Sequence, residues 1–318
     1  MSINYLQSAN KLGVKNFDVI VIGGGAAGLS SAVWCAELGL KALLVEKNAE
    51  LGGQLLWTHN QIKNHLGIET ENGRELRDVF VRQAENFEFD ICLNAEIYEI
   101  DLANKTILLE NGKKVFAQAI ILAAGVRRRK LNVEGEDEFK DRGIIESGKR
   151  DGQLARGKNA LVIGGGDAAL ENALILSEIA LTVTLAHRRA GFGARNEFLE
   201  KARENPKIKI LTETTVRRIL GNERVEAVEL HNPVAKQTQI IPAEIVLVRI
   251  GVEPNTNNLR GAIDLDERGY IKINSSCETN IKNIFAAGDV ANPLSPTISS
   301  AVGMGATAAK VISSRLNM

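Results

Sequence analysis

An internal repeat constrains the fold of this 318-residue chain more than any other feature. One copy, FDVIVIGGGAAGLSSAVWCAELGLKALLVEK, begins at Phe17, and the other, KNALVIGGGDAALENALILSEIALTVTLAHRR, begins at Lys158. Each predicts a buried strand, a glycine-rich turn, an amphipathic helix and a second strand, the βαβ unit of a dinucleotide-binding fold. Two copies in this context predict an α/β protein with two Rossmann-like, three-layer domains. The alternative is an unrelated α/β fold with two glycine-rich turns.

The glycines of the first turn have separate physical roles. Gly23 allows the tight turn, Gly25 lets the backbone approach a pyrophosphate, and Gly28 allows close packing of helix on strand. The helix N-terminus then presents free N–H groups and the positive end of its dipole to the phosphates. In the second copy these places are held by Gly164, Gly166 and Ala169.

The two copies differ at the tip of the second strand. The first has Glu46, whose carboxylate is placed to accept hydrogen bonds from ribose hydroxyls and would repel a 2′-phosphate. The second has His187, Arg188 and Arg189, and guanidinium groups bind phosphate bidentately. We therefore expect an adenosine dinucleotide without a 2′-phosphate in the first site and NADP(H) in the second, with assistance from Arg195. A solvated strand end is the alternative for the arginine pair.

Three later stretches predict apolar strands that return into the two sheets. They are IILAAGV (120–126), VLVRIGV (246–252) and NIFAAGDV (283–290), and each contains a glycine at or near its end. We expect Gly125 and Gly251 to act as hinge-like exits from the first two.

The third returning strand carries the most specific signal. Asp289 stands at its tip, before a Gly/Ala-rich helix that can approach a cofactor closely, and a carboxylate there suits a ribitol hydroxyl. The helix N-terminus near Thr297 suits the electron-rich edge of a flavin. A plain Asx turn before a helix is the alternative.

Composition excludes several function classes. Lys and Arg number 39, as do Asp and Glu, so the bulk charge favours neither nucleic acid nor an acidic membrane as a partner. No apolar run approaches the roughly 18 residues that suggest a membrane span. The opening MSINYLQSANKLGVKNF predicts a short polar extension with neither a signal-peptide core nor an acylation pattern.

The cysteines lie far apart and form no C-x-x-C pair. This spacing argues against a disulfide framework or a zinc site and fits a reducing cytoplasm. Cys35 and Cys92 fall in apolar stretches and are expected to fill the core, whereas Cys277 in the polar NSSCETN is expected to be exposed. The histidines are scattered and suggest no metal site.

Together these motifs resemble the low-molecular-weight thioredoxin reductases of the FAD/NAD(P)-binding pyridine nucleotide-disulfide oxidoreductase superfamily, over nearly the whole chain. The matching pieces are DVIVIGGGAAGLSSA, GGQL, AIILAAGVRRRKLNVEGE, VIGGGDAALENALIL, HRR, IGVEPNT, GYIKIN and NIFAAGDV. The resemblance implies an FAD-binding domain at 1–127 and 253–318, with an NAD(P)H-binding domain inserted at 128–252. It also implies a homodimer.

The resemblance and the motifs supply candidate residues for both cofactors. The candidates for FAD are Gly23, Gly25, Gly28, Glu46, Gly52, Gly53, Gln54, Gly125, Gly288, Asp289 and Thr297. The candidates for NADP(H) are Gly164, Gly166, Asp167, Ala168, His187, Arg188, Arg189 and Arg195.

The chain departs from the family pattern at three places. Ser147 and Arg150 stand where the family has its redox-active C-x-x-C, and neither can accept an electron pair or form a mixed disulfide. Pro296-Thr297 replaces the family's Arg-Gln pair before the final helix. The loop LLWTHNQIKNHLGI replaces a threonine-rich flavin loop, and its Trp57 and His59 are placed either to face the isoalloxazine ring or to pack structurally.

These observations predict an FAD-dependent NAD(P)H oxidoreductase that lacks a dithiol and passes electrons from flavin directly to an external acceptor. The nearest analogue is the ferredoxin/flavodoxin–NADP reductase branch of the superfamily, although quinones and O₂ remain possible acceptors. Two alternatives stay open: a disulfide reductase that uses other thiols, and a catalytically weak nucleotide-sensing flavoprotein.

Basic residues favour an acidic redox carrier, such as ferredoxin or flavodoxin, as the partner. The alternative is an ordinary solvated linker and turn. The residues are Arg127, Arg128, Arg129, Lys130, Lys149, Arg150, Arg156 and Lys158.

Overall fold

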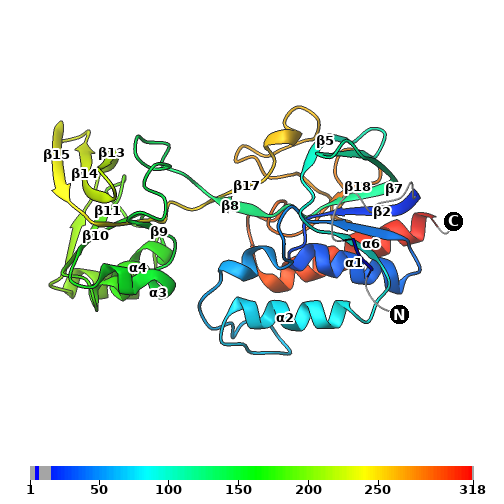
Figure 1. The fold of residues 1–318 in the computed structure, drawn as a ribbon, viewed down its shortest axis with the longest axis horizontal. Coiled ribbons are helices and arrows are strands. Elements are labelled where there is room, and N and C mark those ends of the chain that lie inside the picture. Colours follow the sequence, from blue (N-terminus) through cyan, green and yellow to red (C-terminus); the bar gives the residue numbers. More distant parts are fainter. Residues whose placement is uncertain (1–3, 7–15, 317–318) are drawn as a thin grey trace. The chain divides into compact units, whose positions relative to one another are not determined.

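The computed structural model describes residues 4–6 and 16–316 of the chain (Figure 1). The chain divides into two compact units, one formed by Met1–Arg127 and Glu253–Met318 and the other by Arg128–Val252. Most of the expected polar extension, residues 1–3 and 7–15, lies outside the described residues. Within it, Asn4–Leu6 form strand β1, which pairs with β4 at an edge of the first sheet.

The first unit is built on one eight-stranded sheet in the order β1-β4-β3-β2-β7-β6-β5, with β18 also paired to β7. Six strands of this sheet run parallel: β1, β4, β3, β2, β7 and β18. Strand β6 pairs antiparallel with β7, and β5 pairs antiparallel with β6. Apart from β1, the strands are β2 (Asn16–Ile22), β3 (Ala42–Val45), β4 (Asp90–Cys92), β5 (Ile97–Asp101), β6 (Thr106–Leu109), β7 (Lys114–Leu122) and β18 (Ile284–Ala286).

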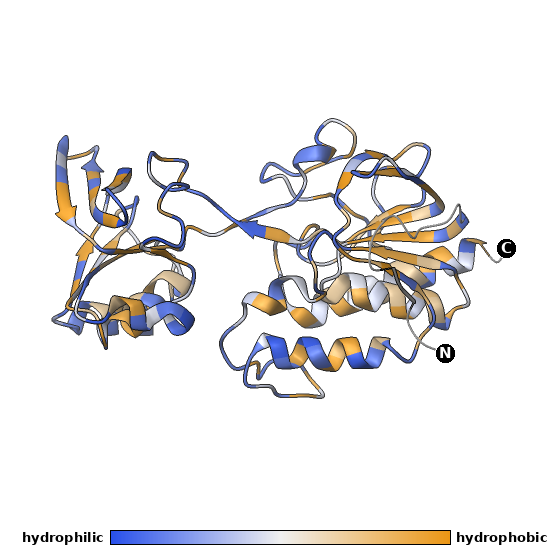
Figure 2. Cartoon of the chain, viewed as in Figure 1, coloured by the Kyte–Doolittle hydropathy of each residue, from blue (hydrophilic) through white to orange (hydrophobic). Residues whose placement is uncertain are grey.

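Helices cover one face of this sheet. Val19, Val21 and Ile121 point to that face, where they pack with buried residues of helices α1 and α6. Ile20 and Ile120 point to the opposite face and form a second core with the 259–291 segment. Figure 2 shows the central strands as largely hydrophobic and α2 as two-sided. The helices are α1 (Ala26–Glu37), α2 (Gly73–Ala84) and α6 (Ile298–Leu316), with 3₁₀ turns η2 (Gly53–Trp57) and η4 (Asn257–Leu259).

The second unit has three layers around a parallel sheet of order β12-β11-β10-β16-β9. One face packs on helices and the other on an antiparallel sheet of order β13-β14-β15. The parallel strands are β9 (Ile144–Ile145), β10 (Asn159–Ile163), β11 (Thr182–Ala186), β12 (Ile208–Leu211) and β16 (Ile245–Val248). The other elements are α3 (Gly148–Asp151), η3 (Gly152–Ala155), α4 (Asp167–Ser177), α5 (Asn196–Glu204), β13 (Thr215–Gly221), β14 (Val225–Asn232) and β15 (Gln237–Pro242).

A two-stranded ladder of β8 (Val126–Arg128) and β17 (Val252–Pro254) carries the chain between the units. Gly125 and Gly251 precede these strands with φ of +64° and +93°. The α/β class and the two Rossmann-like units are confirmed. None of the helices in the described part of the chain is long and apolar enough to cross a bilayer.

Candidate functional site

The first glycine-rich loop joins β2 to α1, and close contacts require its glycines. Gly23 has φ +106°, and a Cβ there would lie 2.4 Å from the Ala123 carbonyl oxygen. A Cβ at Gly28 would lie 1.8 Å from the Gly23 carbonyl oxygen. In front of Gly25, by contrast, the nearest atom to a Cβ is the Gly53 Cα at 3.9 Å. The loop is therefore tightly packed behind and open in front, as a cradle for a diphosphate must be.

A second glycine turn lies against this loop. The Gly52 N–H donates to the Gly24 carbonyl at 2.8 Å, and Gly52 and Gly53 have φ of +131° and +53°. The side-chain amide of Gln54 donates to the Val126 carbonyl at 2.7 Å. The fold thus brings these three FAD candidates, from a separate stretch of sequence, to the loop and to the exit of β7.

Glu46 follows β3 and is 6% exposed. Its Oε2 accepts the Gly24 N–H at 2.7 Å, and its Oε1 accepts the backbone and side-chain N–H groups of Asn48 at 2.9 and 2.7 Å. A carboxylate has about four lone-pair positions, so capacity remains for a ribose hydroxyl. Asn48 is not among the residues predicted from the sequence. Its only signal there is its position two residues after Glu46, a spacing at which side chains often bond to the nearby backbone.

Gly288 and Asp289 follow β18 and lie beside α1. Gly288 has φ +78°, and a Cβ there would lie 2.8 Å from the Ala27 Cβ. The Asp289 carboxylate is half-buried and accepts no hydrogen bond from any residue in 4–6 or 16–316, and burial raises its pKa. A desolvated carboxylate without a donor fits a ribitol hydroxyl.

The remaining candidates of the first unit lie at element ends. Thr297 directly precedes α6, and its hydroxyl accepts the Ser300 N–H at 3.2 Å, an N-cap of the helix. A Cβ added at Gly125 would have no atom within 4 Å, so space is open there. Trp57 is 48% exposed and does not belong to the core, whereas His59 is half-buried.

We expect Asp289→Asn to stabilise the flavin-free protein by about 0.5 kcal/mol at neutral pH and to weaken flavin binding. Because the pKa of Asp289 is raised on folding, the native state holds the proton more tightly than the unfolded state. Its contribution therefore favours folding at low pH and is lost as the pH rises through the folded-state pKa. The amide removes this loss.

Urea unfolding of flavin-free protein at about pH 4 and about pH 8 measures the effect. The advantage of the Asp289→Asn protein is expected at the higher pH and should shrink at the lower one. Asp264→Asn, at an exposed position of the same unit, is the matched control. Equal stability of the native and Asp289→Asn proteins at both pH values would contradict a desolvated Asp289 carboxylate with a raised pKa.

The second glycine-rich loop repeats this geometry between β10 and α4. Gly164 has φ +149°, and a Cβ there would lie 2.1 Å from the Arg249 carbonyl oxygen. Gly166 has no atom within 4 Å of such a Cβ, so the loop is again open in front. A Cβ at Gly165 would meet the His187 ring at 2.2 Å. His187 thus packs under the loop.

The His187 ring is held by one ring contact and one polar contact. It stacks on Phe192 with ring centroids 4.9 Å apart, and its Nε2 is 3.0 Å from the Gly191 carbonyl oxygen. Burial lowers its pKa, and the charges of Arg189 and Arg188 lower it further, against the Gly191 contact, which raises it. The geometry therefore gives His187 a packing role under the loop.

The two arginines that follow it are exposed, and neither has an ion-pair partner among the described residues. Arg188 and Arg189 are therefore available to a phosphate. Arg195 is engaged instead: its backbone N–H and its Nε donate to the Asp167 carboxylate at 2.7 and 2.9 Å. The Ala168 carbonyl accepts from the side chain of Asn172 at 2.7 Å.

The Ser147–Arg150 segment, which the resemblance aligns with the family's dithiol, forms a helix cap. Ser147 is buried and its hydroxyl accepts the Arg150 N–H at 3.2 Å, at the start of α3. The Asp151 carboxylate accepts the Ser147 N–H at 3.0 Å and pairs with the Arg150 side chain at 2.5 Å. These contacts hold the turn without any redox-active group.

All three thiols are buried and free. Burial raises the pKa of each, and that of Cys35 reaches about 12. A protonated, buried thiol is neither a nucleophile nor a readily oxidised group. The core positions of Cys35 and Cys92 are confirmed, but the expected exposure of Cys277 is wrong. Its turn, with φ +61° and an N–H bonded to the Asn274 carbonyl at 3.0 Å, directs it into the first unit's core.

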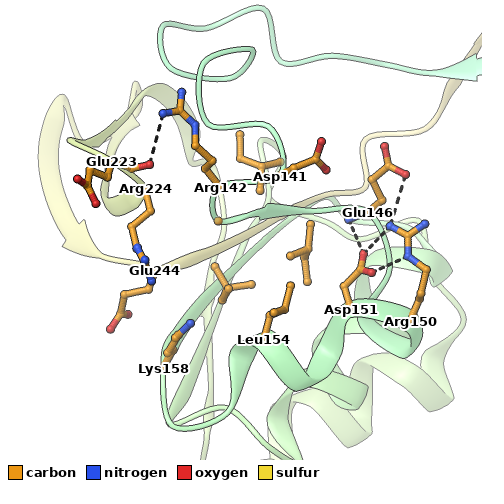
Figure 3. A pocket seen from close by; sticks show the side chains of 14 residues that line it. Asp141, Arg142, Glu146, Arg150, Asp151, Leu154, Lys158, Glu223, Arg224 and Glu244 are labelled. Carbon is orange, nitrogen blue, oxygen red and sulfur yellow. Dashed lines mark hydrogen bonds and ion pairs between the residues drawn. The ribbon is translucent and has the colours of Figure 1, made fainter.

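Beside the α3 segment the second unit has a cavity of about 500 Å³ (Figure 3). Figure 3 shows Arg150 between Glu146 and Asp151, and Arg142 directed to the Glu223 carbonyl. The rim has mixed charge and does not select for acidic ligands. It contains Asp141, Arg142, Glu146, Arg150, Asp151, Lys158, Glu223, Arg224 and Glu244. Within the described ranges, no three His, Cys, Asp or Glu side chains gather to hold a metal ion.

The residues present fit two dinucleotides. Each unit has a glycine loop that is closed behind and open in front, at the N-terminus of a helix. The first unit adds oriented or unpartnered carboxylates at Glu46 and Asp289, and the second adds exposed guanidinium groups.

Comparisons with known proteins agree with this geometry. The pyridine nucleotide-disulphide oxidoreductase family matches residues 17–305. The chain is 35% identical to a thioredoxin reductase of Mycolicibacterium smegmatis over 92% of this chain and 94% of that protein. It is 31% identical to a 34.2 kDa protein in the rubredoxin operon of Clostridium pasteurianum over 93% and 96%. The crystal structure of Lactococcus lactis thioredoxin reductase superposes with a TM-score of 0.82 at 31% identity, covering 93% of this chain and 97% of that one.

The match spans nearly the whole chain in sequence and in structure, and thioredoxin reductase-like proteins use FAD and NADPH. The chain therefore belongs to the pyridine nucleotide-disulphide oxidoreductase family and is a thioredoxin reductase-like oxidoreductase.

Proposed function

We propose that this protein is an FAD-dependent NAD(P)H oxidoreductase without a dithiol, which passes electrons from the flavin directly to an external acceptor. The observation that carries the proposal is the state of its sulfur. Ser147 and Arg150 form a helix cap at the family's dithiol positions, and every thiol is buried with a raised pKa. A disulfide relay needs an accessible thiolate, which this chain does not offer.

We assign FAD to the unit 1–127 with 253–318 and NADPH to the unit 128–252. FAD, when bound, accepts a hydride from NADPH and can release the electrons one at a time. The first glycine loop binds the diphosphate, Glu46 the ribose and Asp289 the ribitol, while α6 directs its N-terminus at the flavin. The second loop binds the diphosphate of NADPH, and Arg188 and Arg189 bind its 2′-phosphate. We also propose a homodimer and a cytoplasmic location.

We propose a small acidic redox protein as the acceptor. One relative is named as a protein in a rubredoxin operon, and rubredoxin is a small redox carrier. Two of the basic residues that suggest a carrier are already neutralised: Lys130 pairs with Asp137 at 2.5 Å, and Arg150 pairs with Asp151 at 2.5 Å. Lys149 and Lys158 have no ion-pair partner among the described residues and supply the complementary charge.

Salt tests the electrostatic part of this proposal. We expect the second-order rate of flavodoxin or ferredoxin reduction to fall about threefold between roughly 0.05 and 0.5 M salt, because screening removes steering by exposed charges. Reduction of a neutral quinone serves as the control and should change little. A carrier rate that does not respond to ionic strength would remove the acidic-carrier assignment.

An anaerobic stopped-flow panel tests the function itself. NADPH or NADH is mixed with the flavin-loaded protein, followed by ferredoxin, flavodoxin, thioredoxin or a quinone. We expect rapid bleaching of the flavin band by NADPH and reoxidation by a one-electron carrier. No bleaching with either nucleotide would favour a sensor, and reoxidation by thioredoxin alone would favour a disulfide reductase.

A further inference from the structure

Two arginines that are not among the candidate NADP(H) residues meet at the carboxyl end of the second unit's parallel sheet. In the strand order β12-β11-β10-β16-β9, β10 carries the glycine loop, β11 lies on one side of it and β16 on the other. In doubly wound sheets a ligand lies across the carboxyl ends of the strands at the point where the strand order reverses. Here that point is between β10 and β16.

Arg249 is the first residue after β16 and stands at this point. Its backbone N–H donates to the Ile163 carbonyl at 2.7 Å, and its carbonyl oxygen is 2.1 Å from where a Gly164 Cβ would lie. Arg249 is therefore part of the rim of the glycine loop. With the 2′-phosphate on Arg188 and Arg189 after β11, as proposed above, the adenosine half would lie toward β11, which leaves the β16 side for the nicotinamide half.

A second guanidinium group meets Arg249 there. Arg249 Nη2 and Arg128 Nη1 both donate to the Glu146 carbonyl oxygen, the latter at 2.7 Å. Arg249 Nη1 also donates to the Val248 carbonyl at 3.1 Å. Carbonyl oxygens carry no net charge, and among the described residues neither arginine forms an ion pair with a carboxylate. Two cations thus share one neutral acceptor.

The pKa shifts of the two arginines also favour an anion at this place. The pKa of Arg249 is lowered to about 10, mainly by burial and also by the charge of Arg128, although the Glu146 and Asp151 carboxylates raise it in part. Burial also lowers the pKa of Arg128. An anion between the two groups would relieve both the desolvation and the mutual repulsion.

We propose that Arg249, assisted by Arg128, binds the nicotinamide-side phosphate of the dinucleotide and so positions the nicotinamide half. This inference rests on the proposed NADP(H) role of the second unit. Two functions are thereby separated at the carboxyl ends of the strands. Arg188 and Arg189 select NADP(H) over NAD(H), whereas Arg249 and Arg128 bind the nicotinamide-side phosphate that both nucleotides have.

Calorimetric titration of the oxidised protein tests this without turnover. The ligands are NADP⁺, NAD⁺ and adenosine 2′,5′-bisphosphate, which lacks the nicotinamide-side phosphate. We expect Arg249→Met to weaken NADP⁺ and NAD⁺ by the same factor, about tenfold or more, because a charge-assisted hydrogen bond is lost. Its affinity for the bisphosphate should stay within about threefold, since that ligand does not reach β16.

Controls separate this inference from its foundation. Arg218→Met removes an arginine of the same unit that is paired with Glu229 at 2.8 Å, and it should leave all three affinities unchanged. Arg128→Met is the second test, and is decisive where Arg249→Met does not fold; a smaller but parallel loss is expected. Native protein that binds no NADP⁺ would overturn the proposed function. Native-like NADP⁺ affinity in both Arg249→Met and Arg128→Met would overturn this inference alone. Arg249 would then have only a structural role, as the contact between the end of β16 and Glu146 after β9.

Discussion

Gly28→Ala is expected to yield protein without bound flavin. The new Cβ would lie 1.8 Å from the Gly23 carbonyl oxygen and 3.0 Å from its carbonyl carbon. Both atoms are backbone, so no side-chain rotation relieves the overlap, and α1 must move away from β2. We expect a loss of about 3 kcal/mol in the free energy of unfolding. The displaced helix N-terminus would also no longer meet the diphosphate.

The ratio of absorbance near the flavin band to protein absorbance measures the flavin content of the purified protein. Gly303→Ala is the matched control, because Gly303 lies within α6 and has no atom within 4 Å of an added Cβ. That substitution should keep the flavin and stabilise the helix by about 0.5 kcal/mol. A yellow, stable Gly28→Ala protein would show that the first loop does not bind the cofactor.

The joint substitution Arg188→Ala and Arg189→Ala should reduce the preference for NADPH over NADH by about a hundredfold. Both guanidinium groups are exposed and have no ion-pair partner among the described residues, so their removal costs no internal contact. The loss should appear in the affinity for NADPH, with little change for NADH. The measurement is the rate of anaerobic flavin reduction as a function of each nucleotide's concentration.

The paired control removes the same charge elsewhere on the unit. Arg203→Ala with Arg217→Ala changes two exposed arginines, on α5 and β13, and should leave the preference unchanged. If both double variants lower the NADPH rate equally, the effect is one of net charge rather than of a 2′-phosphate site.

Local patterns in the sequence were sufficient to predict the two βαβ units. Buried β-branched residues and glycine spacing are properties of short segments, so β2, α1, β10 and α4 follow from them directly. The role of Gly28 is also predictable, since one short loop sets its clash with Gly23.

Contacts between distant segments were not predictable in the same way. Polar neighbours suggested an exposed Cys277, but its turn places the thiol in the core. Asp167 and Arg195, both nucleotide candidates, bond to each other across 28 residues. The meeting of Arg128 with Arg249 depends on β16 and β9 being neighbours, which no local pattern encodes.

The buried state of the thiols leads to the central claim that electrons pass from NADPH through flavin to the acceptor without any protein sulfur. The most direct test is the variant in which Cys35, Cys92 and Cys277 are all replaced by alanine, loaded with FAD and studied anaerobically. We predict that NADPH bleaches its flavin and that a one-electron carrier restores the colour, both at rates close to those of the native protein. A variant that keeps its flavin and its fold but no longer passes electrons to the acceptor would contradict the account.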